Sequence, residues 1–490
     1  MRVLRLAITA FVLAVALAFA DGCGAVTLDV TAGGIAGGTL VGKDESALTL
    51  RGSVNAADLD WIARNCRELR RLDMREVTVE PCRLEKGLAT GLREFPGGVL
   101  PAYSLSGLAA QELVLPEGIT EISDGALLGA AVTDIVLPES VVRIGEGAFA
   151  GCGALRSIRL GQRLECIGRY AFRGCAELVS VEAGGGCLRE IGDRAFSGCL
   201  KLETFGFVSS TPALAALGEE AFSSSGLRSL DLSACTGLQT IGPRAFSGCA
   251  SLEELRLPPS VTEMGEGVLF GCESLREFSL PESVVRIPDM ALTGASGISD
   301  AAALLHQRVS QIGDYSLAGI DTPGDVALPE SLQRIGTGAF EGWTSLAFVD
   351  AENLKSVPEL GNAVWAGVNC PETVLSVAKG METEFASADQ WKDFIIRIPD
   401  ESTLDRLPVA DSAGEALIEA SFDNSVLNVR TAAEITSVTV YATDGRALFS
   451  SAVKNSCSLS LQTGLPTGRV YIIALRLHSD ALLGLKLVNK

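Results

Sequence analysis

The stretch IGEGAFAGC, residues 144–152, decides the fold because the chain keeps returning to it. Taken alone, its glycines suggest a phosphate-binding loop, with Gly145 and Gly147 opening a G-x-G motif. A dinucleotide fingerprint places its third glycine three residues after the second, between a strand and a helix, whereas Gly151 follows Gly147 after four. A phosphate cradle also needs one special copy before a helix, so the recurrence favours turn glycines in a repeat.

The copies form a series with a nearly constant spacing. Most of them pair an aliphatic residue with a glycine, and successive copies start 23 to 26 residues apart. A fixed period in the twenties is typical of a solenoid, in which every coil contacts only its neighbours. A degenerate copy begins at Ile122, ahead of nine copies that begin at Ile144, Ile167, Ile191, Leu217, Ile241, Met264, Ile287, Ile312 and Ile335.

Each coil divides into a strand, a turn and an aromatic corner. In LRSIRL, residues 155–160, we expect Leu155, Ile158 and Leu160 to point inward while the polar residues face solvent. That alternation fits a short strand that pairs in parallel with the next coil, and the proline of LPES ends it because proline cannot donate to the ladder. Equivalent residues of stacked coils lie about 4.8 Å apart. The repeat is therefore predicted to build a buried aromatic column that includes Phe149, Phe172 and Phe196.

The cysteines follow the same repeat. Thirteen are present and none belongs to a C-x-x-C motif. Buried free cysteine behaves as a small hydrophobe, so we expect reduced core thiols. Disulfides between adjacent coils, for example Cys152 with Cys175, are the alternative because the ladder spacing is within disulfide reach. Five cysteines occupy the end of the phrase: Cys152, Cys175, Cys199, Cys249 and Cys272.

The unit L-x-x-I-x-L-P-x-S-V-x-x-I-G-x-x-A-F-x-G-C resembles the leucine-rich repeats of BspA-like bacterial surface proteins. The resemblance implies a β-rich solenoid, right-handed and curved, with a parallel β ladder and irregular or short 3-10 turns. It also implies an N-terminal α/β cap, and residues 48–80 are similar to one, with a helix over residues 56–70. Caps are required because an uncovered end exposes core and strand edges.

The other end of the repeat region also looks closed. Residues 375–398 resemble the closing segment of such proteins, in which Trp391 and Phe394 seal the last coil. We therefore expect a capping region over residues 21–110 and the solenoid with its C-terminal cap over residues 111–398.

A different module follows. Residues 399–425 form a polar linker without a period, and residues 426–490 alternate as strands around the turn-forming pair Asp444-Gly445. This pattern predicts a small Ig-like antiparallel β-sandwich. The module resembles the C-terminal sorting domain of type IX secretion cargo, which implies contact with the secretion machinery and passage across the outer membrane. A terminal Ig-like domain without a sorting role is the alternative. The matching residues are Asp444, Gly445, Arg446, Gly468, Tyr471, Lys486 and Lys490.

The N-terminus is typical of export. Arg2 and Arg5 precede an apolar run, and an A-x-A site ends at Ala20, so residues 1–20 are predicted to be a cleaved signal peptide. A lipoprotein signal that uses Cys23 is the alternative. No later stretch is predicted to cross a membrane. We expect an exported protein, located at the outer-membrane cell surface or secreted.

Several classes of function are disfavoured. The net charge of −20 argues against nucleic-acid binding, which needs clustered Lys and Arg. The two histidines, His306 and His478, lie in no nucleophile motif and at no HExxH spacing. We found no D-x-D-x-D-G calcium loop. We therefore expect no enzyme, no cofactor and no metal.

The remaining hypothesis is recognition of a macromolecule by the outward residues of the repeated strands. BspA-like relatives imply an adhesin that binds host matrix proteins or partner bacteria, and a structural surface-layer component is the alternative. For any single residue, a merely solubilising charge competes with a binding role. The candidate ligand face comprises Arg156, Arg159, Glu182, Glu203, Arg228, Asp231, Glu253, Glu254, Arg256, Arg276, Glu277 and Phe348.

Overall fold

The computed structural model describes the chain in two compact units. Unit 1 comprises residues 1–298 and 312–320, and unit 2 comprises residues 299–311 and 321–490. The predicted signal peptide, its cleavage site at Ala20 and the rival Cys23 lie outside the described residues. The described residues are 25–36, 45–84, 88, 91–184, 186–207, 212–299, 304–320, 324–398, 419–423, 426–442, 447–463, 469–477 and 482–489.

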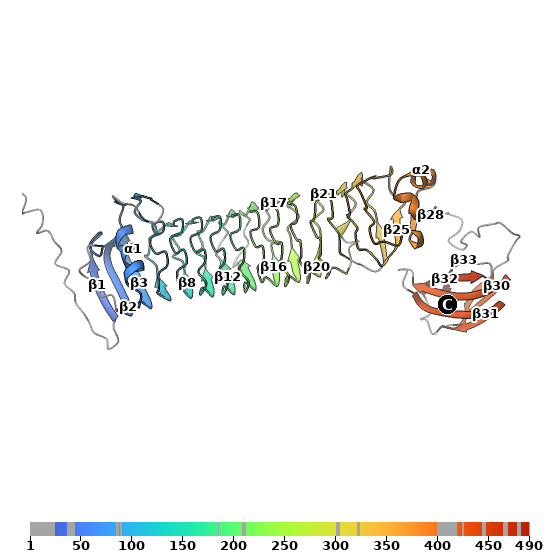
Figure 1. Ribbon diagram of the computed structural model, residues 1–490, viewed down its shortest axis with the longest axis horizontal. Helices are drawn as coiled ribbons and strands as arrows, with labels where there is room; N and C mark the ends of the chain where they lie inside the picture. The colour runs from blue at the N-terminus through green and yellow to red at the C-terminus, as the bar shows by residue number, and fades with distance from the viewer. Residues whose placement is uncertain are drawn as a thin grey trace, which may run out of the picture. The chain divides into compact units, whose positions relative to one another are not determined.

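Unit 1 is built on one long parallel sheet, to which each coil contributes a strand (Figure 1). Pairing is in register, so that inward Ile158 lies opposite Ile135 on one side and Val181 on the other. The predicted parallel solenoid is confirmed. Its strands, in spatial order, are β1 (Ala25–Val30), β2 (Ala47–Val54), β3 (Arg71–Val79), β6 (Glu112–Val114), β8 (Asp134–Val136), β10 (Ser157–Arg159), β12 (Ser180–Ala183), β14 (Thr204–Phe207), β16 (Ser229–Asp231), β18 (Glu254–Arg256) and β20 (Glu277–Phe278).

A second parallel sheet runs along the side that starts the repeated phrase. Its strands are two residues long, and each buries its second residue, as Ile144 and Ile167 do, or half-buries it, as Met264 does. They are β7 (Glu121–Ile122), β9 (Arg143–Ile144), β11 (Cys166–Ile167), β13 (Glu190–Ile191), β15 (Ala216–Leu217), β17 (Thr240–Ile241) and β19 (Glu263–Met264). The remaining short strands of this part of the chain are β4 (Cys82–Arg83), β5 (Glu94–Phe95), β21 (Arg286–Ile287) and β22 (Gln311–Ile312).

The glycines of the phrase meet two different requirements. A Cβ at Gly168 would lie 2.8 Å from the backbone of Gly145 in the preceding coil, so the first glycine permits close stacking. Gly151, at the end of the phrase, has a φ of 68° and nothing within 4 Å of a Cβ placed there. Its role is the left-handed turn that glycine adopts most readily. The interpretation as turn glycines therefore holds for the last position, and the first serves packing.

The predicted core columns are present. Phe149, Phe172, Phe196, Phe222 and Phe246 stack with ring centroids 5.0 to 5.7 Å apart. The five cysteines of the phrase are free and buried, as expected for core thiols. Each donates its Sγ–H to a backbone carbonyl one coil back, as Cys199 does to Phe172 at 3.2 Å. Burial raises the pKa of both Cys152 and Cys199 to about 12.

The N-terminal cap contains the predicted helix, but in a shorter form. Helix α1 spans Ala56–Asn65 rather than residues 56–70. It ends early because Cys66 and Leu69 are buried and because the amides of Arg70 and Arg71 both donate to the carbonyl of Ser46, which starts β3. In the described part of the chain, no helix is long and apolar enough to cross a membrane.

Unit 2 contains further parallel strands and the aromatic closing segment. Trp391 and Phe394 are buried, as expected for a cap, and their rings contact Trp365. Strands β24 (Arg334–Ile335) and β26 (Glu359–Leu360) pair with each other. The other elements are β23 (Gly324–Ala327), β25 (Leu346–Ala351), β27 (Val374–Val377), β28 (Ile395–Arg397), η2 (Cys370–Glu372), α2 (Glu382–Ser387) and η3 (Trp391–Asp393).

The C-terminal module is antiparallel, as predicted. Its strands are β29 (Glu419–Asp423), β30 (Val426–Ala442), β31 (Ala447–Gln462), β32 (Arg469–Leu477) and β33 (Leu482–Asn489). Strand β30 pairs with β29, β31 and β32, and its inward residues build the core. Tyr471 pairs with Leu487 and Lys486 with Ile472. Asp444, Gly445, Arg446, Gly468 and Lys490 lie outside the described residues.

Candidate binding face

The outer face of the long sheet is defined by the side chains of β6 to β20 that point away from the core. Each strand buries a central residue and presents the residues on either side of it, and the register aligns these across coils. The first outward column is Glu112, Asp134, Ser157, Ser180, Thr204, Ser229, Glu254 and Glu277. The second outward column includes Val136, Arg159, Glu182, Gly206, Asp231 and Arg256.

Most of the sequence-predicted residues lie where the repeat placed them. Six belong to the two outward columns: Arg159, Glu182, Asp231, Glu254, Arg256 and Glu277. The others of unit 1 are exposed and stand directly before the strands; they are Arg156, Glu203, Arg228, Glu253 and Arg276. Phe348 differs, because it lies in β25 of unit 2, half-buried and paired with Asp325 and Val374.

Part of the face is neutralised by ion pairs. Arg159 lies 2.9 Å from Glu182, and Arg256 bonds Glu254 and lies 3.9 Å from Glu277. Such exposed pairs contribute at most about 1 kcal/mol each, so they orient side chains more than they stabilise the fold. By contrast, Arg156, Arg228 and Arg276 make no ion pair within 4.0 Å among the described residues. Their guanidinium groups are open to a ligand.

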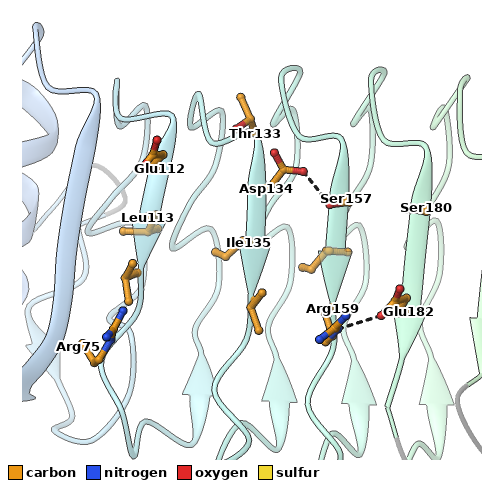
Figure 2. A pocket seen from close by; sticks show the side chains of 13 residues that line it. Arg75, Glu112, Leu113, Thr133, Asp134, Ile135, Ser157, Arg159, Ser180 and Glu182 are labelled. Atoms are coloured by element: carbon orange, nitrogen blue, oxygen red, sulfur yellow. Dashed lines mark hydrogen bonds and ion pairs between the residues drawn. The ribbon is translucent and has the colours of Figure 1, made fainter.

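A groove of about 610 Å³ is hollowed into the N-terminal part of this face (Figure 2). It runs over β6, β8, β10 and β12, and Arg75 of β3 borders it. Figure 2 shows Glu112 and Asp134 toward one end of the strands and Arg75 and Arg159 toward the other. The complete lining is Arg75, Glu112, Leu113, Val114, Thr133, Asp134, Ile135, Val136, Ser157, Ile158, Arg159, Ser180 and Glu182.

The groove combines an apolar patch with oriented polar groups. Val136 is 65% exposed although it is apolar, and half-buried Val114 lies in the neighbouring strand. The hydroxyl of Ser157 donates to Asp134 at 2.7 Å, which fixes the carboxylate at the rim. An exposed apolar side chain within a charged rim can bury a ligand's apolar group while the rim orients its charges.

Sequence reasoning found only two of the lining residues, Arg159 and Glu182. It missed Val136 because the search for a ligand face looked for charged and aromatic side chains. The signal was present in DIVLPES, where Val136 follows inward Ile135 and must therefore point outward. Arg75 carried no comparable signal because it precedes the regular copies.

A stack of coils with a period of 23 to 26 residues, each contributing one strand to a shared face, defines a protein of the leucine-rich-repeat class. The chain belongs to the BspA type leucine rich repeat family, whose pattern matches in six copies over residues 99–225, 185–299 and 215–347. These ranges together span about half of the chain.

One solved structure supports this fold, and two others are similar over part of the chain. The chain is similar to a leucine-rich repeat protein from Bacteroides ovatus, with 20% identity, a TM-score of 0.54, and coverage of 78% of this chain and 96% of that one. A leucine rich repeat protein of T. pallidum is 26% identical, with a TM-score of 0.26 and coverage of 41% and 76%. A leucine rich cell surface protein from Faecalibacterium prausnitzii is 17% identical, with a TM-score of 0.25 and coverage of 57% and 86%. No curated protein matches the sequence.

Proposed function

We propose that the chain is a non-enzymatic cell-surface recognition protein that binds a macromolecular ligand through the outer face of the long sheet. The groove over β6 to β12 is its anchor point, and the observation that carries this proposal is the 65% exposure of Val136 inside a charged rim. The ligand is a host matrix protein or a component of a partner bacterium's surface, in keeping with membership of the BspA type family.

The backbone of this face leaves recognition to side chains. Its strands pair in parallel on both sides, so the amides and carbonyls of β8, β10 and β12 are used within the sheet. Binding energy in protein interfaces concentrates in a few buried apolar or aromatic anchors surrounded by polar groups. Val136 is suited to be such an anchor, and the polar groups around it are suited to form the surrounding rim.

The charge arrangement supports one ligand orientation. Asp134 at one end can attract a cationic group and Arg75 at the other a carboxylate, whereas Arg159 is already paired with Glu182 at 2.9 Å and Glu112 with Arg71 at 3.1 Å. Farther along the face, the unpaired guanidinium groups of Arg228 and Arg276 extend the surface available to a long ligand.

A binding panel tests the proposal. The secreted chain is applied to immobilised matrix proteins and to whole partner bacteria, and Val136→Asn is compared with Leu200→Asn. These two residues are both apolar and both 65% exposed, but Leu200 does not line the groove. We expect Val136→Asn to weaken binding about tenfold, which corresponds to about 1.4 kcal/mol, and Leu200→Asn to leave it unchanged. Equal effects of the two variants, or no binding anywhere, would favour a structural surface-layer role.

We also propose that the C-terminal module is a sorting domain. Two of its motif residues, Tyr471 and Lys486, lie in the adjacent paired strands β32 and β33, which supports a folded recognition unit. Deleting residues 486–490 is expected to leave the protein in the periplasm, as measured by surface labelling of intact cells. Unchanged surface display would favour a terminal domain without a sorting role.

A further inference from the structure

A second feature of unit 1 lies in the turn that follows the short strands. At one position of every coil from Tyr103 to Gly267 the backbone is left-handed, with φ between 52° and 62°. Glycine occupies this position in several coils, including those of Gly125, Gly147 and Gly267. Four consecutive coils between them place a side chain there: Tyr170, Arg194, Glu220 and Arg244. A left-handed residue with a Cβ costs about 1–2 kcal/mol, and the same position also carries a side chain at Tyr103, Met290 and Tyr315.

The side chains at these strained positions hold one another. Arg194 donates to the Tyr170 hydroxyl at 3.1 Å and to both carboxylate oxygens of Glu220 at 2.8 and 3.0 Å. It also donates to Glu219 at 2.7 Å. The hydrogen bond from Arg194 lowers the pKa of the Glu220 carboxyl, so the pair stays ionised at neutral pH. The Tyr170 hydroxyl is thus held by the guanidinium group that also binds Glu219 and Glu220.

Two further arginines lie on that ring. The guanidinium carbon of Arg169 is 4.6 Å from the Tyr170 centroid and that of Arg173 is 5.5 Å away. Both side chains are exposed. The nearest carboxylate to Arg169 is that of Asp193 at 3.9 Å, and Arg173 makes no ion pair within 4.0 Å among the described residues. Cation–π packing orients a guanidinium group while leaving its N–H donors free for a planar oxyanion.

The backbone around this cluster offers nothing to a ligand. The amide of Tyr170 donates to the carbonyl of Asp193, that of Phe172 to Ala195 and that of Gly174 to Ser197, at 2.8 to 2.9 Å. An extended peptide would find no free strand edge here. A nucleic-acid base would find the Tyr170 ring already covered by Arg169. What remains accessible is a pair of guanidinium groups, which suits a ligand whose peripheral groups are oxyanions.

The charge of this part of the chain differs in sign from that of the whole chain. Residues 143–194 carry eight arginines and six carboxylates, whereas the whole chain has a net charge of −20. A polyanion is repelled by the chain as a whole, so its binding must be local. At the Tyr170 ring, Arg194 is paired with Glu219 and Glu220, so the groups left for a ligand are those of Arg169 and Arg173.

We propose that Arg169 and Arg173, oriented on the ring of Tyr170, bind the sulfate or carboxylate groups of an anionic polysaccharide. Tyr170 and Arg194 are positioning residues for this site. It lies in the turn between β11 and β12 rather than on the outer face of the long sheet, so it is independent of the protein-binding role proposed above.

The test uses the full chain with dextran sulfate and polygalacturonate as probes, and with neutral dextran and poly-glutamate for comparison. We expect at least one anionic polysaccharide to bind at low ionic strength, and its identity distinguishes sulfate from carboxylate recognition. Neutral dextran should not bind. The double variant Arg169→Gln/Arg173→Gln should lose at least tenfold in affinity. Arg244→Gln, which removes an arginine already paired with Glu266 at 3.1 Å, should stay within twofold of the original chain.

Tyr170→Gly separates binding from folding. Glycine suits the left-handed backbone, so we expect the melting temperature to hold while polysaccharide binding falls at least fivefold, because the two arginines lose their support. The proposal is overturned if neither polysaccharide binds, if the double variant and Tyr170→Gly bind like the original chain, or if poly-glutamate binds and the polysaccharides do not.

Discussion

Two stretches of unit 1 build the same coil from different core side chains. In the aromatic segment, phenylalanine fills the corner of five successive coils, from Phe149 to Phe246. In the leucine segment that follows, the same corner is filled by Leu269, Leu292 and Leu317, all of which are buried. The backbone hydrogen bonds at this corner are the same in both segments. The amide of Phe172 donates to the carbonyl of Ala195 and that of Leu292 to the carbonyl of Ser316, both at 2.8 Å.

The comparison separates what specifies a coil from what stabilises it. The backbone ladder is common to both segments, and the closely stacked first glycine recurs in the leucine segment at Gly265 and Gly313, with Pro288 in its place in the coil of Leu292. The corner side chain only has to be large, apolar and buried. We therefore expect the two segments to differ in stability and in their response to pH, but not in shape.

The largest expected effect is that of emptying the aromatic corner. The ring of Phe196 stacks on Phe172 at 5.0 Å and on Phe222 at 5.3 Å, so Phe196→Ala leaves a cavity between two rings. We expect a loss of about 4 kcal/mol in the free energy of unfolding, measured by urea denaturation. Leu292→Ala should cost about 3 kcal/mol.

Phe196→Leu is the control for this prediction, because it converts the aromatic corner into the leucine type. It should cost no more than about 1.5 kcal/mol. If Phe196→Leu proved as damaging as Phe196→Ala, ring stacking rather than filled volume would hold the aromatic segment together.

The first glycine of the phrase should come next. A Cβ at Gly218 would lie 2.4 Å from the backbone nitrogen of Asp193, so Gly218→Ala must push two coils apart. We expect a loss of about 2–3 kcal/mol in the free energy of unfolding. Gly271→Ala is the matched control, because its φ is 69° and its nearest neighbour would be 3.9 Å away. Only the left-handed strain of about 1 kcal/mol should appear there, and equal losses at both sites would refute the distinction between the two glycines.

Much of this coil was predictable from the sequence, because the repeat supplies many independent observations of each position. Ile158 and Phe172 were placed in the core by periodicity alone, and both are buried. The end of helix α1 was not predictable, since it depends on where Arg70 and Arg71 meet the carbonyl of Ser46, just before strand β2.

The sites were less predictable than the coil for a physical reason. A binding site arises where one coil differs from its neighbours, and a pattern derived from the repeat averages such differences away. Val136 and Tyr170 are both departures of this kind, and each gains its role from side chains of other coils, such as Arg75 and Arg194. Periodicity gives the position of a residue but not the direction of its neighbours' side chains.

A buried hydroxyl weakens the leucine segment. Ser316 occupies the position that alanine holds in the aromatic segment, and its Oγ is buried without a hydrogen-bond partner among the residues that the structure describes. An unsatisfied buried polar group costs about 1–3 kcal/mol. We expect Ser316→Ala to raise the free energy of unfolding by about 1.5 kcal/mol, as measured in urea. Ala195→Ser, the reverse change in the aromatic segment, should lower it by a similar amount, and a stabilising Ala195→Ser would contradict this account.

The smallest expected effect is the difference in pH dependence, which comes from the thiols. Burial raises the pKa of Cys199 from 9.0 to about 12. Below pH 9 the thiol is protonated in both folded and unfolded chains, so its contribution to the free energy of unfolding is fully present. Between pH 9 and 12 only the unfolded chain ionises, and stability falls. When the pH rises from 8.5 to 10, the free energy of unfolding should fall by about 1 kcal/mol less in Cys199→Ala than in the original chain. Urea titrations at the two pH values measure this difference. In the leucine segment the coil of Leu269 keeps Cys272 at this position, whereas the coils of Leu292 and Leu317 carry Ala295 and Ile320, so Ile320→Val should keep the original pH dependence. An identical decline in Cys199→Ala would mean that this thiol is already ionised or exposed in the folded state, and the buried thiols would then not explain a difference in pH response between the coils that carry cysteine and those that do not.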